Sequence, residues 1–281
     1  MPNLTVLISQ LVTLALNEDL NSQTAKDGDI TAQLIPIEQT VSAYVITREE
    51  CTFCGKDIIF EVFKQVDPTV EVTVLINDGD SIPANSTLFT AKGSARSILT
   101  AERTALNFIQ TLSGTATTTA RYVKELNGTT TQLLDTRKTI PGLRALQKYA
   151  VKCGGGVNHR IGLFDAFLIK ENHIAACGGI NKAVVQAKKN HPDRPVEVEV
   201  ESLNELEQAI CAGADIIMLD NFSVEQIKRA VIITNKRAKL EVSGNITLET
   251  LRTYSQVGVD FISSGALTKN LLSIDLSMRF K

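Results

Sequence analysis

The sequence predicts an α/β protein in which an N-terminal α+β open sandwich domain precedes an irregular parallel α/β barrel. From about residue 132, short apolar runs alternate with amphipathic helical stretches, as in chains that build parallel sheets. Six such runs in succession favour a closed barrel over an open sheet. The first third of the chain mixes helical and strand patterns without this alternation, which is typical of an α+β layer.

The second part contains six expected strands, at residues 132–135, 166–170, 196–201, 215–220, 239–243 and 260–263. In the run Val196-Glu197-Val198-Glu199-Val200-Glu201, a carboxylate occupies every second position. A strand buried on both faces of an open sheet would not tolerate this pattern, but a strand that points one carboxylate into a polar barrel mouth would. The spacing of Ser202 and Glu205 predicts a capping box at the start of the next helix.

The first third is expected to form a small sheet with helices on one face. Residues 4–16 and 57–65 have helical patterns, and residues 40–48 and 71–76 have strand patterns. Residues 94–126 form a long helical stretch, which Gly114 is expected to break into two helices. We therefore place the N-terminal α/β sandwich domain at 1–112 and the barrel domain at 113–272, with the C-terminal tail, about 273–281, free to rejoin the first domain.

Composition excludes several classes of function. The 281 residues carry a net charge of −2, whereas a nucleic-acid-binding protein would be expected to have a strongly basic face. The N-terminal helix lacks the basic flank of a signal peptide, and no later run is long and apolar enough to span a membrane. Five irregularly spaced cysteines argue against a disulfide framework and favour a cytoplasmic location.

Cys51 and Cys54 are the one cysteine pair with suggestive spacing. A zinc site would need two more ligands, and the sequence offers no second pair at suitable spacing. The thioredoxin-like redox pattern is matched only loosely. We interpret both residues as thiols packed at the start of a helix.

Charged and glycine-containing segments occur where the expected strands end. Because the chain as a whole is nearly neutral, cations concentrated in this way indicate one small, highly anionic ligand. Active sites of βα barrels form at the carboxyl ends of their strands. The last two strands end in Ser-Gly loops, where backbone N–H groups and helix N-termini favour phosphate. These strand-end residues are Thr136, Arg137, Lys138, Lys170, Glu199, Asp220, Ser243, Gly244, Asn245, Ser264, Gly265 and Ala266.

Glu199 and Asp220 follow adjacent strands in this scheme. Two carboxylates beside a phosphorylated ligand most simply hold Mg²⁺, directly or through water, together with ribose hydroxyls. The alternative is that they only pair with Arg137, Lys138 or Lys170, which would leave the phosphate loops without a cation site.

The chain resembles the quinolinate phosphoribosyltransferases (carboxylating nicotinate-nucleotide pyrophosphorylases). The resemblance runs from roughly residue 18 to the end, with its motifs in order. The motifs are Ala101-Glu102-Arg103-Thr104-Ala105-Leu106-Asn107, Asp135–Thr139 with Pro141-Gly142-Leu143-Arg144, Gly154–Arg160, Lys170–His173, Val196–Glu201, Leu219-Asp220-Asn221 and the two Ser-Gly loops.

The resemblance implies transfer of phosphoribosyl from phosphoribosyl pyrophosphate to quinolinate with decarboxylation, in de novo NAD biosynthesis, with Mg²⁺. It implies a homodimer or dimer-based oligomer with a shared active site. Arg137, His159 and Arg160 would bind the quinolinate carboxylates, helped by Arg103 of the neighbouring subunit. Thr136 would line the substrate site. Lys138 and Lys170 would contact the pyrophosphate and ribose side, Glu199 and Asp220 the metal and ribose hydroxyls, and Ser243–Asn245 with Ser264–Ala266 the 5′-phosphate. We expect Lys138, Lys170, Glu199 and Asp220 to be the catalytic residues.

The sequence departs from many relatives at Asn245, where they have a second glycine; asparagine can still adopt the left-handed conformation. Arg144, Lys148 and Lys152 are expected to be solvated surface charges. His173 is expected to be structural, with a hydrogen bond at a helix start.

Three other functions are weighed against this interpretation. A nicotinate phosphoribosyltransferase that does not decarboxylate would bind only one carboxylate. This chain supplies more cationic groups than one carboxylate needs. A Schiff-base aldolase would use Lys170 as its nucleophile. A catalytically silent phosphosugar-binding protein would have little need for the whole charged set.

Overall fold

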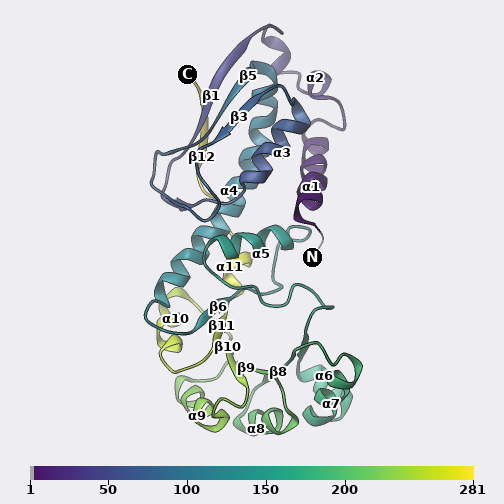
Figure 1. Cartoon of the computed structure of the whole chain (residues 1–281), viewed down its shortest axis with the longest axis vertical. Helices are drawn as coiled ribbons and strands as arrows, with labels where there is room; N and C mark the ends of the chain where they lie inside the picture. The colour runs from purple at the N-terminus through teal and green to yellow at the C-terminus, as the bar shows by residue number, and fades with distance from the viewer. Residues whose placement is uncertain (1–2) are drawn as a thin grey trace. The chain divides into compact units, whose positions relative to one another are not determined.

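The computed structural model describes residues 3–281, which divide into two compact units (Figure 1). The first unit takes the described residues up to Thr118 together with Ala145–Gly155 and Leu271–Lys281. The second takes Thr119–Arg144 and Gly156–Asn270. Helix α4 (Ala95–Glu125) runs through residue 112 without interruption, so no break in secondary structure marks the expected domain boundary there. That boundary stays a prediction.

The first unit contains a four-stranded antiparallel sheet in the order β12-β1-β5-β3. Its strands are β1 (Thr40–Thr47), β3 (Glu71–Val74), β5 (Thr87–Ser94) and β12 (Leu276–Phe280). The predicted α+β layer is confirmed, and the structure shows that its sheet is antiparallel. Strand β5 was not among the expected strands, because Leu88 and Phe89 are both buried and interrupt its alternation. The register explains why: Val45 pairs with Phe89 and Ile46 with Thr87, so Leu88 is the extra residue of a β-bulge.

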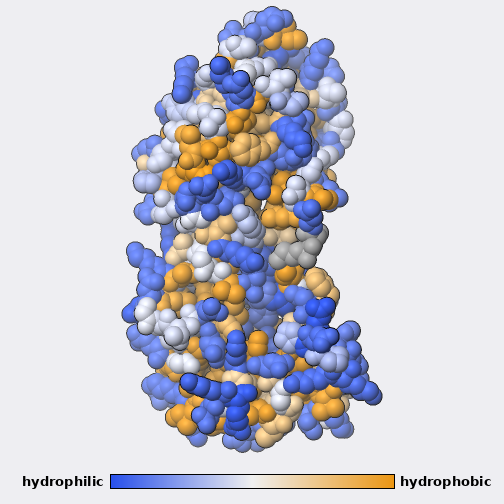
Figure 2. Space-filling model, viewed as in Figure 1, coloured by the Kyte–Doolittle hydropathy of each residue, from blue (hydrophilic) through white to orange (hydrophobic). Residues whose placement is uncertain are grey.

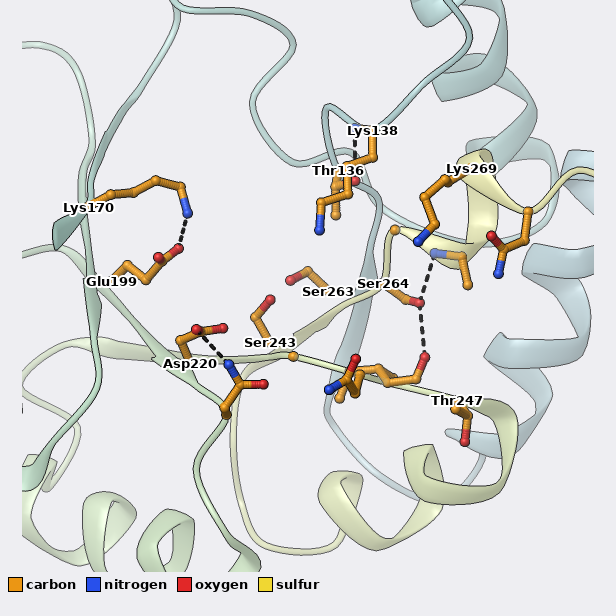
Figure 3. A pocket seen from close by; sticks show the side chains of 17 residues that line it. Thr136, Lys138, Lys170, Glu199, Asp220, Ser243, Thr247, Ser263, Ser264 and Lys269 are labelled. Carbon is orange, nitrogen blue, oxygen red and sulfur yellow. Dashed lines mark hydrogen bonds and ion pairs between the residues drawn. The ribbon is translucent and has the colours of Figure 1, made fainter. Parts of the chain in front are cut away.

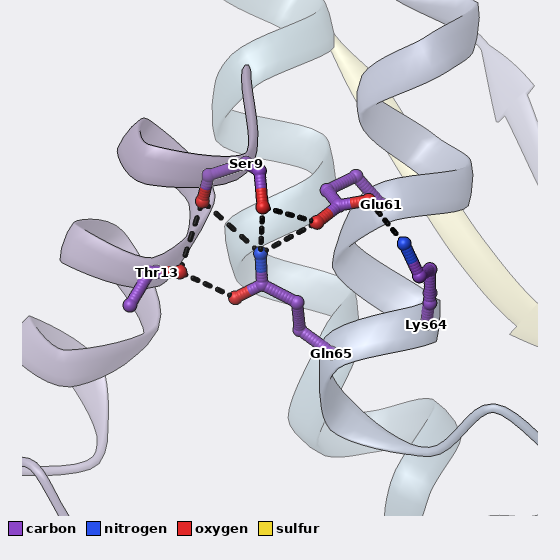
Figure 4. Close-up of polar contacts among 5 residues, drawn as sticks. All are labelled: Ser9, Thr13, Glu61, Lys64 and Gln65. Carbon is purple, nitrogen blue, oxygen red and sulfur yellow. Dashed lines mark hydrogen bonds and ion pairs between the residues drawn. The ribbon is translucent and has the colours of Figure 1, made fainter. Parts of the chain in front are cut away.

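Helices cover this sheet in two layers. Helix α3 (Lys56–Val66) contacts the sheet through Phe63, whose ring lies edge-on to that of Phe89 at 6.1 Å between centroids. Helix α1 (Leu4–Asp19) packs on α3 through a polar network (Figure 4). Ser9 Oγ donates to Glu61 Oε1 at 2.7 Å, and Gln65 Nε2 donates to the same oxygen at 2.8 Å. These two hydrogen bonds lower the pKa of Glu61.

The remaining elements of the first unit are short. They are α2 (Ala25–Gly28), a 3-10 turn at Ala32–Leu34, α5 (Arg144–Cys153), and the paired strands β2 (Cys51–Thr52) and β4 (Ser81–Ile82).

The second unit contains a six-stranded parallel sheet in the order β6-β11-β10-β9-β8-β7. All six expected strands are confirmed. The last strand of this unit, β11, pairs with its first strand, β6, as a barrel requires. The sheet thus curves into an arc with helices along its outer side (Figure 1), consistent with an α/β barrel. The strands are β6 (Gln132–Leu134), β7 (Phe167–Ile169), β8 (Val196–Val200), β9 (Ile216–Asp220), β10 (Lys239–Ser243) and β11 (Phe261–Ser263).

The helices of the second unit begin at side-chain caps in several cases. Ser202 Oγ accepts the Glu205 N–H at 3.2 Å, as predicted, but the Glu205 carboxylate accepts from Glu201 N–H at 2.8 Å and not from Ser202. The predicted capping box is therefore half formed. The helices are α6 (Glu171–Cys177), α7 (Ile180–Asn190), α8 (Leu203–Ala212), α9 (Val224–Thr234), α10 (Leu248–Ser255) and α11 (Ala266–Lys269).

Hydrophobic residues on the face drawn in Figure 2 lie in separate patches among hydrophilic ones. Within residues 3–281, no helix has both the length and the apolar character needed to span a membrane.

The expected helix break at Gly114 is wrong, because α4 is continuous from Ala95 to Glu125. Glycine serves a different purpose here. A Cβ built on Gly114 would lie 2.1 Å from the Leu272 carbonyl oxygen and 3.0 Å from its carbon. The glycine therefore allows the returning C-terminal segment to cross the helix in close contact.

We expect Gly114→Ala to destabilise the protein, although glycine-to-alanine changes within helices ordinarily stabilise by up to about 1 kcal/mol. The added methyl group meets backbone atoms that can move only with the C-terminal segment, so the overpacking cost of roughly 1–3 kcal/mol should prevail. Urea denaturation measures the difference. Thr111→Ala, at a partly exposed position of the same helix, is the control; a Gly114→Ala protein as stable as wild type would contradict the close approach.

Candidate active site

The carboxyl end of β6 is extended by a segment that follows it much later in the chain. Val157 forms a parallel bridge with Leu134, its N–H donates to Leu133 O at 2.8 Å, and its carbonyl accepts from Asp135 N–H at 3.2 Å. The buried Asp135 carboxylate then accepts the His159 N–H at 2.9 Å. Residues 157–160 are thereby held beside the strand end that carries the 136–138 segment.

A small pocket of about 170 Å³ is formed where these two segments meet the strand ends. Its cationic lining residues are Arg137, Lys138, Arg160 and Lys170, with His159 beside them. Burial lowers the pKa of Arg160, and the neighbouring charge of Arg137 lowers it further. Two guanidinium groups that repel each other in this way favour a ligand with negative charge between them. Its other lining residues are Thr136, Leu168, Glu199, Met218, Glu241, Ser243 and Ser263.

Two carboxylates inside the barrel contact the His159 imidazole. Its Nε2 lies 2.9 Å from Glu197 Oε2 and 3.5 Å from Glu241 Oε2, and both glutamates are buried. Burial lowers the pKa of His159, but its hydrogen bonds with these carboxylates outweigh burial and raise it. The imidazole Nδ1 lies 2.8 Å from the Arg160 amide nitrogen, so Nε2 is the nitrogen whose N–H faces Glu197. Burial, with the nearby Glu241 charge, raises the pKa of Glu197 to about 7.

A larger pocket of about 580 Å³ adjoins the first and shares six of its lining residues, which are Thr136, Lys138, Lys170, Glu199, Ser243 and Ser263. Figure 3 shows Lys138, Lys170 and Lys269 reaching toward it from different segments. The Lys170 ammonium forms an ion pair with Glu199. Lys138 is anchored through its backbone, because its carbonyl accepts from Thr268 Oγ1 at 2.8 Å and its N–H donates to Thr136 Oγ1 at 3.1 Å. This pocket therefore presents ammonium groups from a backbone that is held in place by hydrogen bonds.

The two Ser-Gly loops form one wall of the larger pocket. Gly244 has a φ of 102° and Asn245 a φ of 45°, so Asn245 adopts the left-handed conformation that the sequence allows. Thr247 caps α10, and its Oγ1 accepts the Thr250 N–H at 3.4 Å. In the second loop, the Ala266 N–H donates to Ser264 Oγ at 3.3 Å. Both loops and the helix starts that follow them thus lie on one side of the pocket, an arrangement that favours anions.

The Glu199 and Asp220 carboxylates also line the larger pocket, where Asp220 lies beside Ser243 at the end of the neighbouring strand (Figure 3). Asp220 Oδ2 accepts one hydrogen bond, from Asn221 Nδ2 at 2.8 Å, and Glu199 pairs with Lys170. A carboxylate has about four lone-pair sites, so both groups can accept further partners. Mg²⁺ is usually bound by one or two carboxylates together with substrate oxygens and waters. The donor set therefore fits Mg²⁺.

The structure brings together every expected site residue of the second unit. Thr136, Lys138, Lys170, Glu199, Asp220, Ser243, Gly244, Asn245, Ser264, Gly265 and Ala266 line the larger pocket, and Arg137, His159 and Arg160 line the smaller one. Arg103 lies on α4 with its side chain exposed, and Arg103 is in the first unit. The expected structural role of His173 is confirmed, because its Nδ1 accepts the Lys170 N–H at 3.1 Å at the start of α6.

The remaining expectations for basic residues divide. Lys152 is exposed, as expected. Lys148 is fully buried, so its expected place on the surface is wrong. Arg144 is partly buried and donates to Thr139 Oγ1 and to the Ile161 carbonyl, both at 3.2 Å, so it braces the site segment and is not merely solvated.

Sequence reasoning missed several lining residues, of which Glu241 and Lys269 carry charge. It also expected only one inward glutamate on β8. Residues two apart on a strand share a face, so Glu197 and Glu199 both point inward. The Glu-Val alternation was the signal for both, but it does not show how deep each lies.

Comparison with known proteins agrees with this architecture. Family models match nearly the whole described chain: quinolinate phosphoribosyl transferase, N-terminal domain, at residues 29–113, and C-terminal domain at residues 115–279. The chain belongs to the quinolinate phosphoribosyltransferase family. It is 43% identical over 253 residues to the probable carboxylating nicotinate-nucleotide pyrophosphorylase of Bacillus subtilis, covering 89% of this chain and 87% of the relative. It is 41% identical to the enzyme of Mycobacterium leprae, covering 94% of each.

Solved structures of this quinolinate phosphoribosyltransferase family share the fold along almost the whole chain. The nicotinate-nucleotide pyrophosphorylase of Francisella tularensis is 54% identical, with a TM-score of 0.95, covering 99% of this chain and 97% of that one. That of Ehrlichia chaffeensis is 39% identical, with a TM-score of 0.91, covering 97% and 98%. Human nicotinic acid phosphoribosyltransferase, at 14% identity and a TM-score of 0.61, shares the fold alone.

The two loop glycines should respond differently to an added methyl group. A Cβ on Gly244 would lie 2.2 Å from Asn221 Oδ1 and 3.1 Å from Asn221 N at a left-handed φ, whereas a Cβ on Gly265 would meet Lys138 Cδ at 3.0 Å, on a flexible side chain. We expect Gly244→Ala to lower kcat/KM roughly 100-fold by displacing the loop, and Gly265→Ala to have a much smaller effect. Steady-state kinetics on both folded variants measures this. Equal losses would show that the left-handed position is not what forms the loop.

Proposed function

We propose that this chain transfers the phosphoribosyl group of phosphoribosyl pyrophosphate to quinolinate, giving nicotinate mononucleotide, pyrophosphate and CO₂. Quinolinate phosphoribosyltransferase activity in NAD biosynthesis is the activity of its family. The observation that supports a residue-level account is the adjacency of two unlike pockets. A small one is lined by guanidinium groups and a larger one by ammonium groups, carboxylates and glycine loops, and six residues line both.

Quinolinate occupies the smaller pocket in this proposal. Arg137 and Arg160 pair with its carboxylates, because the planar guanidinium matches a carboxylate in bidentate geometry. His159 is held by Glu197 and Glu241, so its ring orientation is fixed before the ligand arrives. The mutual repulsion of the two arginines is relieved when the dianion lies between them, which favours a diacid over a monoacid.

Phosphoribosyl pyrophosphate occupies the larger pocket. Its 5′-phosphate lies against the loops at Ser243–Asn245 and Ser264–Ala266, where backbone N–H groups face the pocket. Glu199 and Asp220 accept hydrogen bonds from the ribose hydroxyls. Lys138 and Lys170 contact the pyrophosphate. Mg²⁺, held by Glu199 and Asp220 directly or through water, would neutralise charge on the leaving pyrophosphate.

The arrangement addresses the main electrostatic obstacle of the reaction. Two highly anionic substrates repel each other, and the cations around both pockets offset that repulsion. The pyridine nitrogen attacks C1′ as the bond to pyrophosphate breaks, and the sugar becomes transiently cationic. The Glu199 and Asp220 carboxylates face that cation, while Lys138 and Lys170 stabilise the leaving charge. Loss of CO₂ then leaves an electron pair on the ring carbon beside the cationic nitrogen, which stabilises that pair until the carbon takes up a proton from solvent.

Arg103 is the one expected substrate ligand outside the second unit. In this proposal the protein forms a homodimer or a dimer-based oligomer, and Arg103 of each chain reaches the quinolinate of the other. Its exposed position on α4 leaves the guanidinium available for such a role.

The alternatives are disfavoured by specific features. Paired arginines with a histidine exceed what the single carboxylate of nicotinate requires. Lys170 forms an ion pair with Glu199, and a lysine held as an ammonium does not act as a Schiff-base nucleophile. Release of CO₂ from quinolinate, dependent on phosphoribosyl pyrophosphate and Mg²⁺, is the decisive assay. Turnover of nicotinate in place of quinolinate would overturn the proposal.

Arg137→Ala should lower kcat/KM, because it removes roughly 2–4 kcal/mol of transition-state stabilisation, the usual cost of losing a preorganised donor. Initial rates at varied quinolinate measure it. Arg237→Ala is a matched control, because its guanidinium bonds only to the carbonyls of Ile233 and Thr234 at the end of α9. Near wild-type kcat/KM in Arg137→Ala would remove this residue from the site.

The shared site can be tested by mixing two inactive proteins. In a mixed dimer of Arg103→Ala and Lys138→Ala chains, one of the two sites takes an intact residue from each chain. Random re-association makes half of the dimers mixed, so about one quarter of wild-type activity should return for an isologous dimer. The dimers are separated by affinity tags and assayed. Mixed dimers without activity would place Arg103 outside the site.

A further inference from the structure

Two thiols and a carboxylate of the first unit form a cluster that takes no part in the proposed reaction. Cys54 lies two residues before the start of α3, Asp78 lies in the turn at 77–80, and Cys153 is the last residue of α5. Their ligand atoms, two Sγ and a carboxylate oxygen, all lie within 4.8 Å of one another. Cys54 is fully buried, while Asp78 and Cys153 are partly buried, so the cluster borders solvent on one side.

The carboxylate of this cluster is firmly oriented. Asp78 Oδ1 accepts the N–H groups of Gly55 and Lys56 at 2.8 and 3.0 Å, and Oδ2 accepts the Tyr149 hydroxyl at 2.8 Å. Cys54 is fixed in turn, because its N–H donates to Ser113 Oγ at 3.0 Å and its carbonyl accepts from the same hydroxyl at 3.3 Å. Ligand groups that are themselves hydrogen-bonded in this way are usual around bound metals.

The charges of the cluster are unbalanced. Among the ion pairs of residues 3–281, none involves Asp78. A carboxylate and two thiols are thus held together with no side-chain cation among them. A cation bound among them would supply the missing positive charge.

We propose that Cys54, Cys153 and Asp78 form a binding site for a thiophilic divalent cation of the Zn²⁺ class. Ligand atoms around tetrahedral Zn²⁺ lie roughly 3.3–3.8 Å apart, as bond lengths of about 2.0–2.3 Å require. The three donor atoms need only small side-chain shifts to reach this spacing. The partly exposed side of the cluster leaves a fourth position for water.

The site differs in class from the carboxylates of the larger pocket. Two thiolates select soft or borderline cations, whereas Glu199 and Asp220 offer only oxygen and suit Mg²⁺. Cys51, the other cysteine of the suggestive sequence pair, does not take part, because its Sγ faces Thr47 Oγ1 at 3.8 Å. The sequence offers no further zinc ligands near Cys51 and Cys54, but the fold brings Asp78 and Cys153 to Cys54. All three ligands lie in the first unit, so the proposal is independent of the proposed reaction.

The test titrates the reduced, full-length protein with Zn²⁺ and Co²⁺. We expect one cation per chain and a thiolate-to-Co²⁺ charge-transfer band that Zn²⁺ abolishes and Mg²⁺ does not. Cys54→Ala and Cys153→Ser should each weaken binding about tenfold or more. Cys51→Ala and Cys211→Ser, which change a buried and an exposed cysteine outside the cluster, should bind as wild type does.

A measurement on the unaltered chain guards against misfolded variants. Zn²⁺ should protect Cys153 from alkylation while the exposed Cys177 and Cys211 still react, as peptide mass spectrometry would show. Absence of the charge-transfer band, or alkylation of Cys153 unchanged by Zn²⁺, overturns the proposal. Recovery of a linked Cys54–Cys153 peptide from the freshly isolated protein also overturns it, because a disulfide consumes both thiolate ligands.

Discussion

Parallel strand pairing is the constraint on which the site depends. When six strands run in the same direction, all their carboxyl ends meet at one edge, whatever their separation along the chain. Lys170, Glu199, Asp220 and the two Ser-Gly loops are consequently neighbours, although they belong to different βα units. The pairing of β11 with β6 completes this arrangement, because it places the second loop beside the strand that the Lys138 segment follows.

The second determinant is how charge is arranged within that edge. Cationic side chains line both pockets. Below them the barrel interior carries the buried carboxyl groups of Glu197 and Glu241, an arrangement that costs desolvation free energy. His159 offsets part of this cost by hydrogen bonding to Glu197. Glu197 and the Arg160 amide hold opposite sides of the His159 ring, so this loop residue is preorganised.

Most of this site could be predicted from the sequence, since strand ends are visible in the hydrophobic pattern and its residues follow them directly. What the pattern could not give was depth. Glu197 and Glu199 have identical neighbours in the sequence, yet only one reaches the open pocket. Lys148 belongs to a helix with the composition of a surface helix, but tertiary packing buries it. The glycine at 114 reads as a helix breaker, and only the crossing segment reveals its purpose. Cys54 and Cys153 are joined by the fold alone, so no local signal connects them.

The pairing of β12 with β1 gives the last few residues an importance that their position would not suggest. Leu276–Phe280 cover one margin of the four-stranded sheet, from Ala43 to Thr47. Without them, the N–H and C=O groups along β1 would be left unsatisfied, and such a margin is a template for another chain. Proteolytic trimming of this short terminus would thus be expected to lead first to self-association, before any loss of the barrel and its chemistry.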